Sequence, residues 1–370
     1  MSGNPSDAIG KPGEAEGARR FDPDLLQSHV AAIFAGHGLS QEDAARAANA
    51  LVRADLRGIW SHGVARSSMY CGRLAKKAAN PRPRTTLERR AAAAALFDGD
   101  DGLGIVVAPR AMAAAIELAK ESGVGLVGVK RSGHFGMAGL YAEQAARAGC
   151  LGWVFTNASP ALPPYGARTA HFGTSPLAFA APTPEGMPLF LIDMAMSVVA
   201  RGKLKFSAQR GEPIPEGLAL DAEGRPTTDG AAAFTGVVLP FGGVKGAALS
   251  WLMDLAGGTF TGAAHAGLAA NPFTGTDRPQ GTGHLFIAAR ADLFMPMEDF
   301  LERMRESILA AKTLPRAEGF EEILTPGEPE ARSEAKMRAE GVPLTRDVVE
   351  DLTALGESVG VSWPEALKPV

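Results

Sequence analysis

The chain has 370 residues, which is enough to bury a large core and, we expect, to form two lobes. Its 37 basic and 41 acidic residues nearly balance, so it has no strong field that would attract nucleic acid or acidic lipid. No apolar run approaches the roughly 20 residues that a membrane span requires. Composition therefore predicts a globular protein that binds neither nucleic acid nor a membrane.

Residues 1–20 are rich in Gly, Ala, Pro and charge and lack the apolar core of a secretion signal. We predict that they form a disordered arm. The two cysteines, Cys71 and Cys150, are isolated, which fits a reducing compartment and excludes a disulfide framework or a cysteine-based zinc site. A cytoplasmic protein without a bound metal is the expectation.

Helices and strands alternate in the first half. Asp22 and Pro23 predict the start of a helix that ends near residue 35, and Ser40 caps a second helix that ends near Gly58. Apolar runs and their breakers then predict a helix over 61–70, a strand over 94–97, a helix over 109–122, a strand over 124–129, a helix ending near 149 and a strand over 151–156.

The second half is expected to be richer in strands. Short apolar runs between Pro and Gly predict strands over 177–181, 189–192, 237–239 and 285–288, a buried apolar helix over 246–256, and further helices over 297–312 and 345–356. This pattern favours a mixed α/β chain.

The segment Ser61-His62-Gly63-Val64-Ala65-Arg66, followed by Tyr70, is the most informative stretch. In a helix that begins near Ser61, the residues His62, Arg66 and Tyr70 fall at i, i+4 and i+8 and share one face. Such a face suits proton transfer at one end of a small substrate and carboxylate binding at the other. A buried histidine beside an exposed arginine has the same spacing, so the pattern alone leaves both interpretations open.

Two glycine-rich segments bear on nucleotide binding. Residues 123–128 match the letters GxGxxG, but they follow a helix and lie in a strand, which is the reverse of the Rossmann arrangement, so we reject that fingerprint. Gly242-Gly243-Val244-Lys245-Gly246 leads into an apolar helix, where free N–H groups and an ammonium are suited to phosphate. A simple turn before a core helix is an equal alternative.

Taken together, motifs over residues 21–330 resemble the type-2 malate/L-lactate dehydrogenase family, also called sulfolactate dehydrogenase-like, which includes ureidoglycolate dehydrogenase, 2,3-diketogulonate reductase and cyclic imino acid reductases. Their order and spacing carry the resemblance. The motifs are Ser61-His62-Gly63 with Arg66 and Tyr70, Ser132-Gly133-His134-Phe135-Gly136, Thr156-Asn157-Ala158-Ser159-Pro160, Gly173-Thr174-Ser175-Pro176, Asp193-Met194-Ala195-Met196-Ser197, the Gly242–Gly246 segment and Pro326-Gly327-Glu328.

The resemblance implies an α/β, sulfolactate dehydrogenase-like fold that is not Rossmann. A mixed-sheet NAD(P)-binding domain would cover 101–296, and a helical domain built from both chain ends, 21–100 and 297–370, would carry the substrate-side residues. It further implies a homodimer and NAD(P)-dependent interconversion of a small 2-hydroxy acid and a 2-oxo acid by hydride transfer. The alternatives are reduction of a cyclic 2-imino acid (piperideine- or pyrroline-2-carboxylate) and a non-catalytic, metabolite-binding relative.

The matched motifs also imply site residues. His62 would move the proton at the substrate C2 oxygen, with His134 as the rival acid/base. Substrate contacts are implied for Ser61, Arg66, Tyr70 and Thr156. Contacts with NAD or NADP are implied for His134, Ser159, Thr174, Ser175, Asp193, Met194, Ala195, Met196, Ser197, Lys245, Gly246, Pro326, Gly327 and Glu328. The candidate acids share a carboxylate and a C2 centre, so these residues leave the particular acid, and the choice of NAD or NADP, open.

Overall fold

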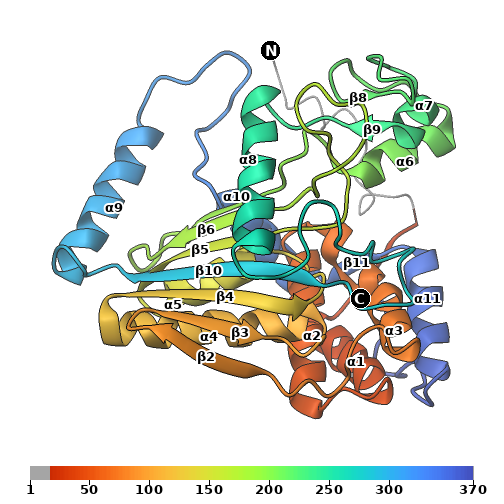
Figure 1. Cartoon of the computed structure of the whole chain (residues 1–370), viewed down its shortest axis with the longest axis horizontal. Helices are drawn as coiled ribbons and strands as arrows, with labels where there is room; N and C mark the ends of the chain where they lie inside the picture. Colours follow the sequence, from red (N-terminus) through yellow and green to blue (C-terminus); the bar gives the residue numbers. More distant parts are fainter. Residues whose placement is uncertain (1–16, 370) are drawn as a thin grey trace.

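A seven-stranded sheet forms the centre of the computed structural model, which describes residues 17–369 (Figure 1). The strand order is β2-β3-β4-β10-β5-β6-β7. β3 and β4 run parallel, whereas the other neighbouring pairs are antiparallel, so the sheet is mixed. The strands are β2 (Thr86–Ala91), β3 (Ala94–Asp98), β4 (Val124–Ser132), β5 (Cys150–Thr156), β6 (Leu177–Ala181), β7 (Phe190–Met194) and β10 (Thr282–Arg290).

Two helices, α4 (Gly104–Ser122) and α5 (Gly139–Arg147), cover one face of this sheet (Figure 1). A core of alanine, aliphatic and aromatic side chains fills the interface between them and the strands. A Cβ atom at Gly125 would lie 1.9 Å from the carbonyl oxygen of Ala115 in α4, so a glycine there lets the helix approach β4 closely. Gly125 of the GxGxxG letters thus serves helix packing, and the rejection of a Rossmann fingerprint is confirmed, because β4 begins at Val124.

Helices and short strands from both chain ends lie together beside the sheet. β1 (Arg19–Phe21) pairs with β11 (Val342–Leu344), and one core unites residues from the two ends. Asp22 caps the first helix through its Oδ1 atom, and Ser40 caps the second through its Oγ atom, as predicted. The helices are α1 (Pro23–Gly36), α2 (Gln41–Leu56), α3 (Ser67–Ala75), α10 (Glu328–Glu340) and α11 (Arg346–Glu357).

Several expected boundaries differ. Residues 86–98, which were grouped with the helical domain, form β2 and β3 of the large sheet. Of the predicted disordered arm, residues 1–16 lie outside the described residues, and Arg19 and Arg20 are in β1. α9 (Met297–Lys312) stands away from the other elements in Figure 1, and Ile308 is the one buried side chain among its residues. The helical domain is therefore built mainly from 19–75 and 328–367.

α4 begins at Gly104, earlier than the predicted start at 109. Pro109 lies inside the helix, where it lacks the N–H that would bond to a carbonyl one turn earlier. Ile105 and Val106 are buried in the helical-domain core, so burial of this first turn compensates for the missing bond. The usual rule that places proline at a helix start fails here for that reason.

A smaller lobe comprises α6 (Arg201–Arg210), β8 (Ala219–Leu220), α7 (Gly230–Thr235), β9 (Val237–Val238) and α8 (Val244–Asp254), which continues into the turn η5 (Leu255–Thr259). The helix predicted over 246–256 was expected to be buried, and this was wrong for its outer face. Trp251 is 59% exposed and Leu255 is 50% exposed, because the core of this lobe covers only the inner face of α8.

No helix among residues 17–369 is long and apolar enough to cross a membrane. Within the same range, no three or more His, Cys, Asp or Glu side chains form a group suited to a metal ion.

Candidate active site

A cavity of about 710 Å³ opens where the helical domain, the sheet and the α6–α8 lobe meet. The ends of β5 and β10 and the loop after β4 form its floor, through Thr156, Thr282 and His134. Three cationic side chains line it, namely Arg66, Arg201 and Lys205, and no Asp or Glu is among the described residues of its wall. The cavity is therefore suited to an anionic ligand.

His62 and Arg66 line this cavity from two short 3₁₀ turns rather than from one helix. The turns are Trp60–His62 and Val64–Arg66, and α3 begins only at Ser67, so the helix predicted over 61–70 is wrong in its first half. The reason is local: Gly63 is extended, and the N–H of Val64 donates to Oδ2 of Asp55 at 2.8 Å instead of to a helical carbonyl. The two side chains nevertheless share the cavity, as predicted.

His134 brings the second predicted imidazole to the same place. Its ring stacks on that of His62, with centroids 5.4 Å apart and an interplanar angle of 5°. The hydroxyl of Tyr70 lies 2.6 Å from Nδ1 of His134, and the N–H of Gly136 donates to this same nitrogen at 3.3 Å. Because a backbone N–H can only donate, Nδ1 is an acceptor, and the ring proton of the neutral imidazole is on Nε2.

Burial controls the charge of these groups. Burial first, and Arg66 second, lower the pKa of His62 to about 4. Burial, followed by the neighbouring His62 and Arg66, holds the pKa of His134 well below its usual value. Burial also raises the pKa of Tyr70 above its usual range. At neutral pH the cavity wall therefore presents two neutral imidazoles and a cationic guanidinium, and the buried, protonated phenol of Tyr70 contacts His134 from outside the described wall.

Arg66 is oriented by two contacts. Its Nε atom donates to the carbonyl of Ser61 at 2.6 Å, and its guanidinium carbon lies 4.9 Å from the ring centroid of Phe273. These contacts leave the terminal nitrogens available for a carboxylate, which guanidinium groups bind in a bidentate manner. Ser61 itself is exposed, and its Oγ atom lies 2.9 Å from Nδ1 of His62.

Thr156 is buried in the wall, where its hydroxyl lies 2.8 Å from Nδ1 of His284. His284 was not predicted as a site residue. Its Nε2 atom contacts Oγ of Ser132, and its ring stacks on Phe135, so it supports the loop that carries His134.

Sequence reasoning also missed several residues of the wall. Oε1 of Gln280 accepts the N–H of His134 at 2.9 Å, which fixes the backbone of that loop. Phe273 covers Arg66 from a loop that no pattern marked. Arg201 and Lys205 come from α6, a helix that was not predicted, although the four-residue spacing from Arg201 to Lys205 could have indicated two cationic side chains on one helix face.

The structure divides the predicted cofactor residues into two groups. His134, Ser159 and Thr174 line the cavity, and Ser175, next to it, is fully buried with no described partner for its hydroxyl. The carboxylate of Asp193 instead accepts the N–H of Gly139 at the start of α5. The remaining predicted cofactor residues outside the described cavity wall are Met194, Ala195, Met196, Ser197, Lys245, Gly246, Pro326, Gly327 and Glu328.

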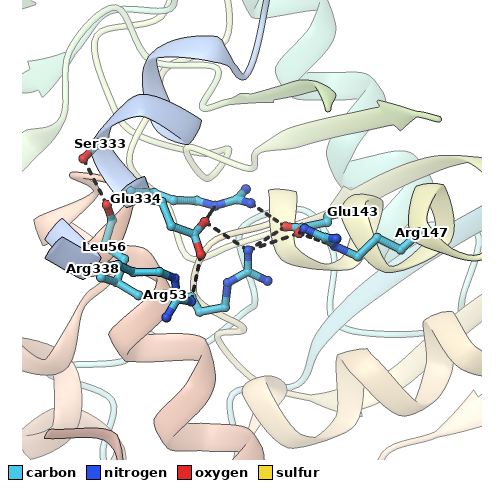
Figure 2. A network of polar contacts seen from close by, with 8 residues as sticks. Arg53, Leu56, Glu143, Arg147, Ser333, Glu334 and Arg338 are labelled. Carbon is cyan, nitrogen blue, oxygen red and sulfur yellow. Dashed lines mark hydrogen bonds and ion pairs between the residues drawn. The ribbon is translucent and has the colours of Figure 1, made fainter. Parts of the chain in front are cut away.

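The end of α2, which leads into the segment with His62, is fixed by a buried ionic network (Figure 2). Arg57 donates to Glu143 of α5 at 2.6 Å and to Glu334 of α10 at 3.1 Å. Arg53 contacts the same two carboxylates. Ser333 donates its hydroxyl to the terminal carbonyl of Leu56. Helices α2, α5 and α10, from distant parts of the chain, are thus joined at the end of α2, just before the segment that carries His62.

Comparison with known proteins gives the family. The family model for malate/L-lactate dehydrogenase matches residues 21–353. A malate dehydrogenase of Pyrococcus abyssi is 37% identical over 94% of this chain and 96% of its own length. A ureidoglycolate dehydrogenase (NAD(+)) of Escherichia coli K12 is 33% identical over 85% of this chain and 89% of its own length.

Solved structures agree. The sulfolactate dehydrogenase of Methanocaldococcus jannaschii superposes with a TM-score of 0.87 at 35% identity, over 93% of this chain and 98% of that one. The Δ1-piperideine-2-carboxylate reductase of Pseudomonas syringae gives a TM-score of 0.78 at 27% identity, over 91% of this chain and 99% of that one. The predicted sulfolactate dehydrogenase-like fold is confirmed, and the chain belongs to the malate/L-lactate dehydrogenase family of oxidoreductases.

Proposed function

We propose that this oxidoreductase interconverts a small 2-hydroxy acid and the corresponding 2-oxo acid in the cavity that His62, Arg66 and His134 line. The carrying observation is the combination of a guanidinium and two stacked, neutral imidazoles in one cavity without a described carboxylate. Arg66 binds the substrate carboxylate through its terminal nitrogens. This places the C2 oxygen beside the imidazoles, where a proton must leave or arrive when hydride is transferred.

The two histidines take different roles in this proposal. His62 is neutral at pH 7 and accepts the proton of the C2 hydroxyl during oxidation, then returns it during reduction. His134 carries its ring proton on Nε2, because Nδ1 is occupied by two donors. It therefore donates a hydrogen bond to the same C2 oxygen. Tyr70 acts through His134 and fixes its tautomer.

A nicotinamide cofactor fits this cavity. Its volume of about 710 Å³ exceeds what a small acid needs, and its cationic wall suits a ligand with phosphates. When bound, the cofactor supplies the hydride chemistry, while the protein orients the substrate and moves the proton. Ser159 and Thr174 line the cavity and would hold the nicotinamide end. The segments 193–197, 245–246 and 326–328 would hold the remainder outside it, and either NAD or NADP is compatible with them.

Two wider properties belong to the proposal. Exposed apolar side chains of α8 and the turns after it, Trp251, Leu252, Leu255 and Phe260, support a homodimer, because patches of this kind mark protein interfaces. Cys71 and Cys150 are buried and free, which supports a reducing, cytoplasmic location. Reduction of a cyclic 2-imino acid is the second candidate. It is favoured by the similarity to the piperideine-carboxylate reductase, since such a substrate presents the same carboxylate and C2 centre.

The test is a spectrophotometric panel. NADH and NADPH are each mixed with the protein and with pyruvate, oxaloacetate, a sulfonated 2-oxo acid and a cyclic 2-imino acid, and nicotinamide absorbance is followed. We expect turnover with at least one 2-oxo acid. The variant Arg66→Lys should raise KM by an amount equivalent to about 1–3 kcal/mol, because a point charge replaces a bidentate fork. Turnover with imino acids alone would favour the second candidate, and none with any acid would contradict the proposal.

A further inference from the structure

The segment between His62 and Arg66 is held from two sides. On the cavity side, Nε of Arg66 donates to the carbonyl of Ser61 at 2.6 Å and bridges the two 3₁₀ turns. On the buried side, Oδ2 of Asp55 accepts the N–H of Val64 at 2.8 Å. Asp55 lies in the last turn of α2 and is only 3% exposed. Its side chain therefore reaches the joint between the two turns from inside the protein.

Gly63 occupies that joint for a reason of space. Its φ of −82° and ψ of −161° are open to any residue, so a left-handed backbone does not require the glycine. A Cβ atom here would lie 1.7 Å from Oδ1 of Asp55 and 2.2 Å from its Cγ atom. The carboxyl group therefore fills the volume in which a side chain at position 63 would lie.

Asp55 is buried without a cationic partner among residues 17–369. No ion pair links it to any residue of the described chain, and burial raises its pKa to about 8, although the Val64 N–H lowers it. Asp43 provides a contrast on the same helix. It is equally buried at 3% but pairs with Arg46 and Arg110. A buried carboxyl group without a cationic partner is unfavourable for stability. We therefore look for the role of Asp55 in its contact with the N–H of Val64.

We infer that Asp55 is the positioning residue of this active site, which holds the Gly63–Val64 joint so that the imidazole of His62 and the guanidinium of Arg66 face the same cavity. Asp55 does not line the cavity in which the substrate would bind. The inference rests on the roles proposed above for His62 and Arg66. Loss of the Val64 bond would free the two turns to rotate against each other, so that proton transfer and carboxylate binding would weaken together, whereas cofactor contacts elsewhere would remain.

The experiment compares Asp55→Ala, Asp55→Asn and the matched control Asp43→Ala in the full chain. Asp55→Ala should lower kcat and raise KM for the acid, each by about tenfold or more, because misplacing a bound group by 1 Å can cost about 100-fold in rate. The Kd of NADH or NADPH, from fluorescence titration, should stay within about twofold. Asp55→Asn keeps an acceptor oxygen for Val64 and should restore most of the activity.

The control separates positioning from stability. Asp43→Ala should lower the urea midpoint but leave kcat and KM near the parent values. If Asp55→Ala changes only the urea midpoint, as Asp43→Ala does, the inference is wrong. Parent protein without turnover on any acid would instead contradict the proposed function, so the two failures are distinguishable.

Gly63→Ala tests the same contact if Asp55→Ala does not fold. Alone, Gly63→Ala should reproduce the combined loss of kcat and gain in KM, because its methyl group displaces the carboxyl. In the Asp55→Ala background the methyl group has room, so the second substitution should cost less than about threefold more. Losses that simply multiply would show that the two residues act independently and would overturn the inference.

Discussion

The stacked imidazoles of His62 and His134 differ in what surrounds their second nitrogen. His134 has Nδ1 occupied by the Tyr70 hydroxyl and the Gly136 N–H, whereas His62 has Nδ1 beside the hydroxyl of Ser61. A hydroxyl can donate or accept, so His62 can change its protonation state without losing this contact. At the scale of single residues, this difference favours His62 for moving the proton and His134 for holding an oxygen.

The pH dependence of oxidation tests this assignment. Because burial and Arg66 lower the pKa of His62 to about 4, kcat/KM for the hydroxy acid should fall only as the pH approaches that value. A bound substrate carboxylate neutralises the charge of Arg66 and so removes one cause of the lowered pKa of His62. The acid limb of the kcat profile should therefore lie at higher pH than that of kcat/KM. Assays are restricted to pH values from which the enzyme recovers full activity.

Two variants identify the group that titrates. His134→Asn should lower turnover but keep the acid limb, and His62→Asn should lower turnover by about 10²–10⁴ and abolish the limb. If the acid limb of the pH profile is unchanged in His62→Asn but lost in His134→Asn, then His134 moves the proton and His62 holds the oxygen.

At the scale of elements, the sequence predicted those helices and strands whose ends are determined by contacts between residues close in the chain. The caps at Asp22 and Ser40 predicted the starts of α1 and α2, and short apolar runs predicted β4 and β5. The 3₁₀ turns before α3 were missed because a bond from Val64 to Asp55, in another helix, decides them. β2 was missed because all six of its residues are exposed and lack an apolar pattern.

The residues of the site also differ in whether contacts close in the chain or far along it determine their position. His62, Arg66 and His134, which line one cavity, could be predicted as site residues because their motifs are short and contiguous. Phe273 could not be identified, since its place over Arg66 depends on the fold of a long loop. That loop is held by Arg73, a buried side chain that donates to the carbonyls of Gly275 and Arg278 far along the chain. Such contacts leave no periodic trace in sequence.

The network at the end of α2 gives a prediction for stability. Glu143 is 1% exposed and faces Arg53 and Arg57, so Glu143→Gln leaves these two guanidinium groups to share the single carboxylate of Glu334. We expect the free energy of unfolding to fall by about 3–5 kcal/mol, as for other broken buried ion pairs. Urea denaturation measures it. Glu117→Gln, which removes an exposed pair with Lys120, should change it by less than about 1 kcal/mol. Equal effects would mean that the network contributes no more than a surface pair.

At the scale of the whole molecule, four histidines with lowered pKa values link folding to pH. Burial lowers the pKa of each, as the leading cause in all four, namely His29, His62, His134 and His284. In the unfolded chain a histidine binds its proton near pH 6.5. Below that pH the unfolded state binds more protons than the folded state, so the free energy of unfolding should decrease as the pH falls.

His29 isolates this effect from catalysis. Both of its ring nitrogens lack a hydrogen-bond partner in the described part of the chain, and its ring packs edge-on against Trp363. His29→Leu should therefore flatten the decline of the urea midpoint below about pH 6.5 without changing kcat at neutral pH. His37→Leu, on a half-buried histidine at the end of α1, is the control. A decline of the same steepness in His29→Leu would exclude this histidine as a contributor.

The charge of the cavity also governs how the enzyme responds to its medium. Arg66, Arg201 and Lys205 are not balanced by any carboxylate in the described wall. Sulfate, phosphate and other small oxyanions present the same charge and acceptor geometry as a substrate carboxylate, so they compete for these side chains. The choice of buffer therefore affects the apparent affinity of the enzyme for the substrate acid. The affinity without a competing oxyanion is measured in chloride or in a zwitterionic buffer at equal ionic strength.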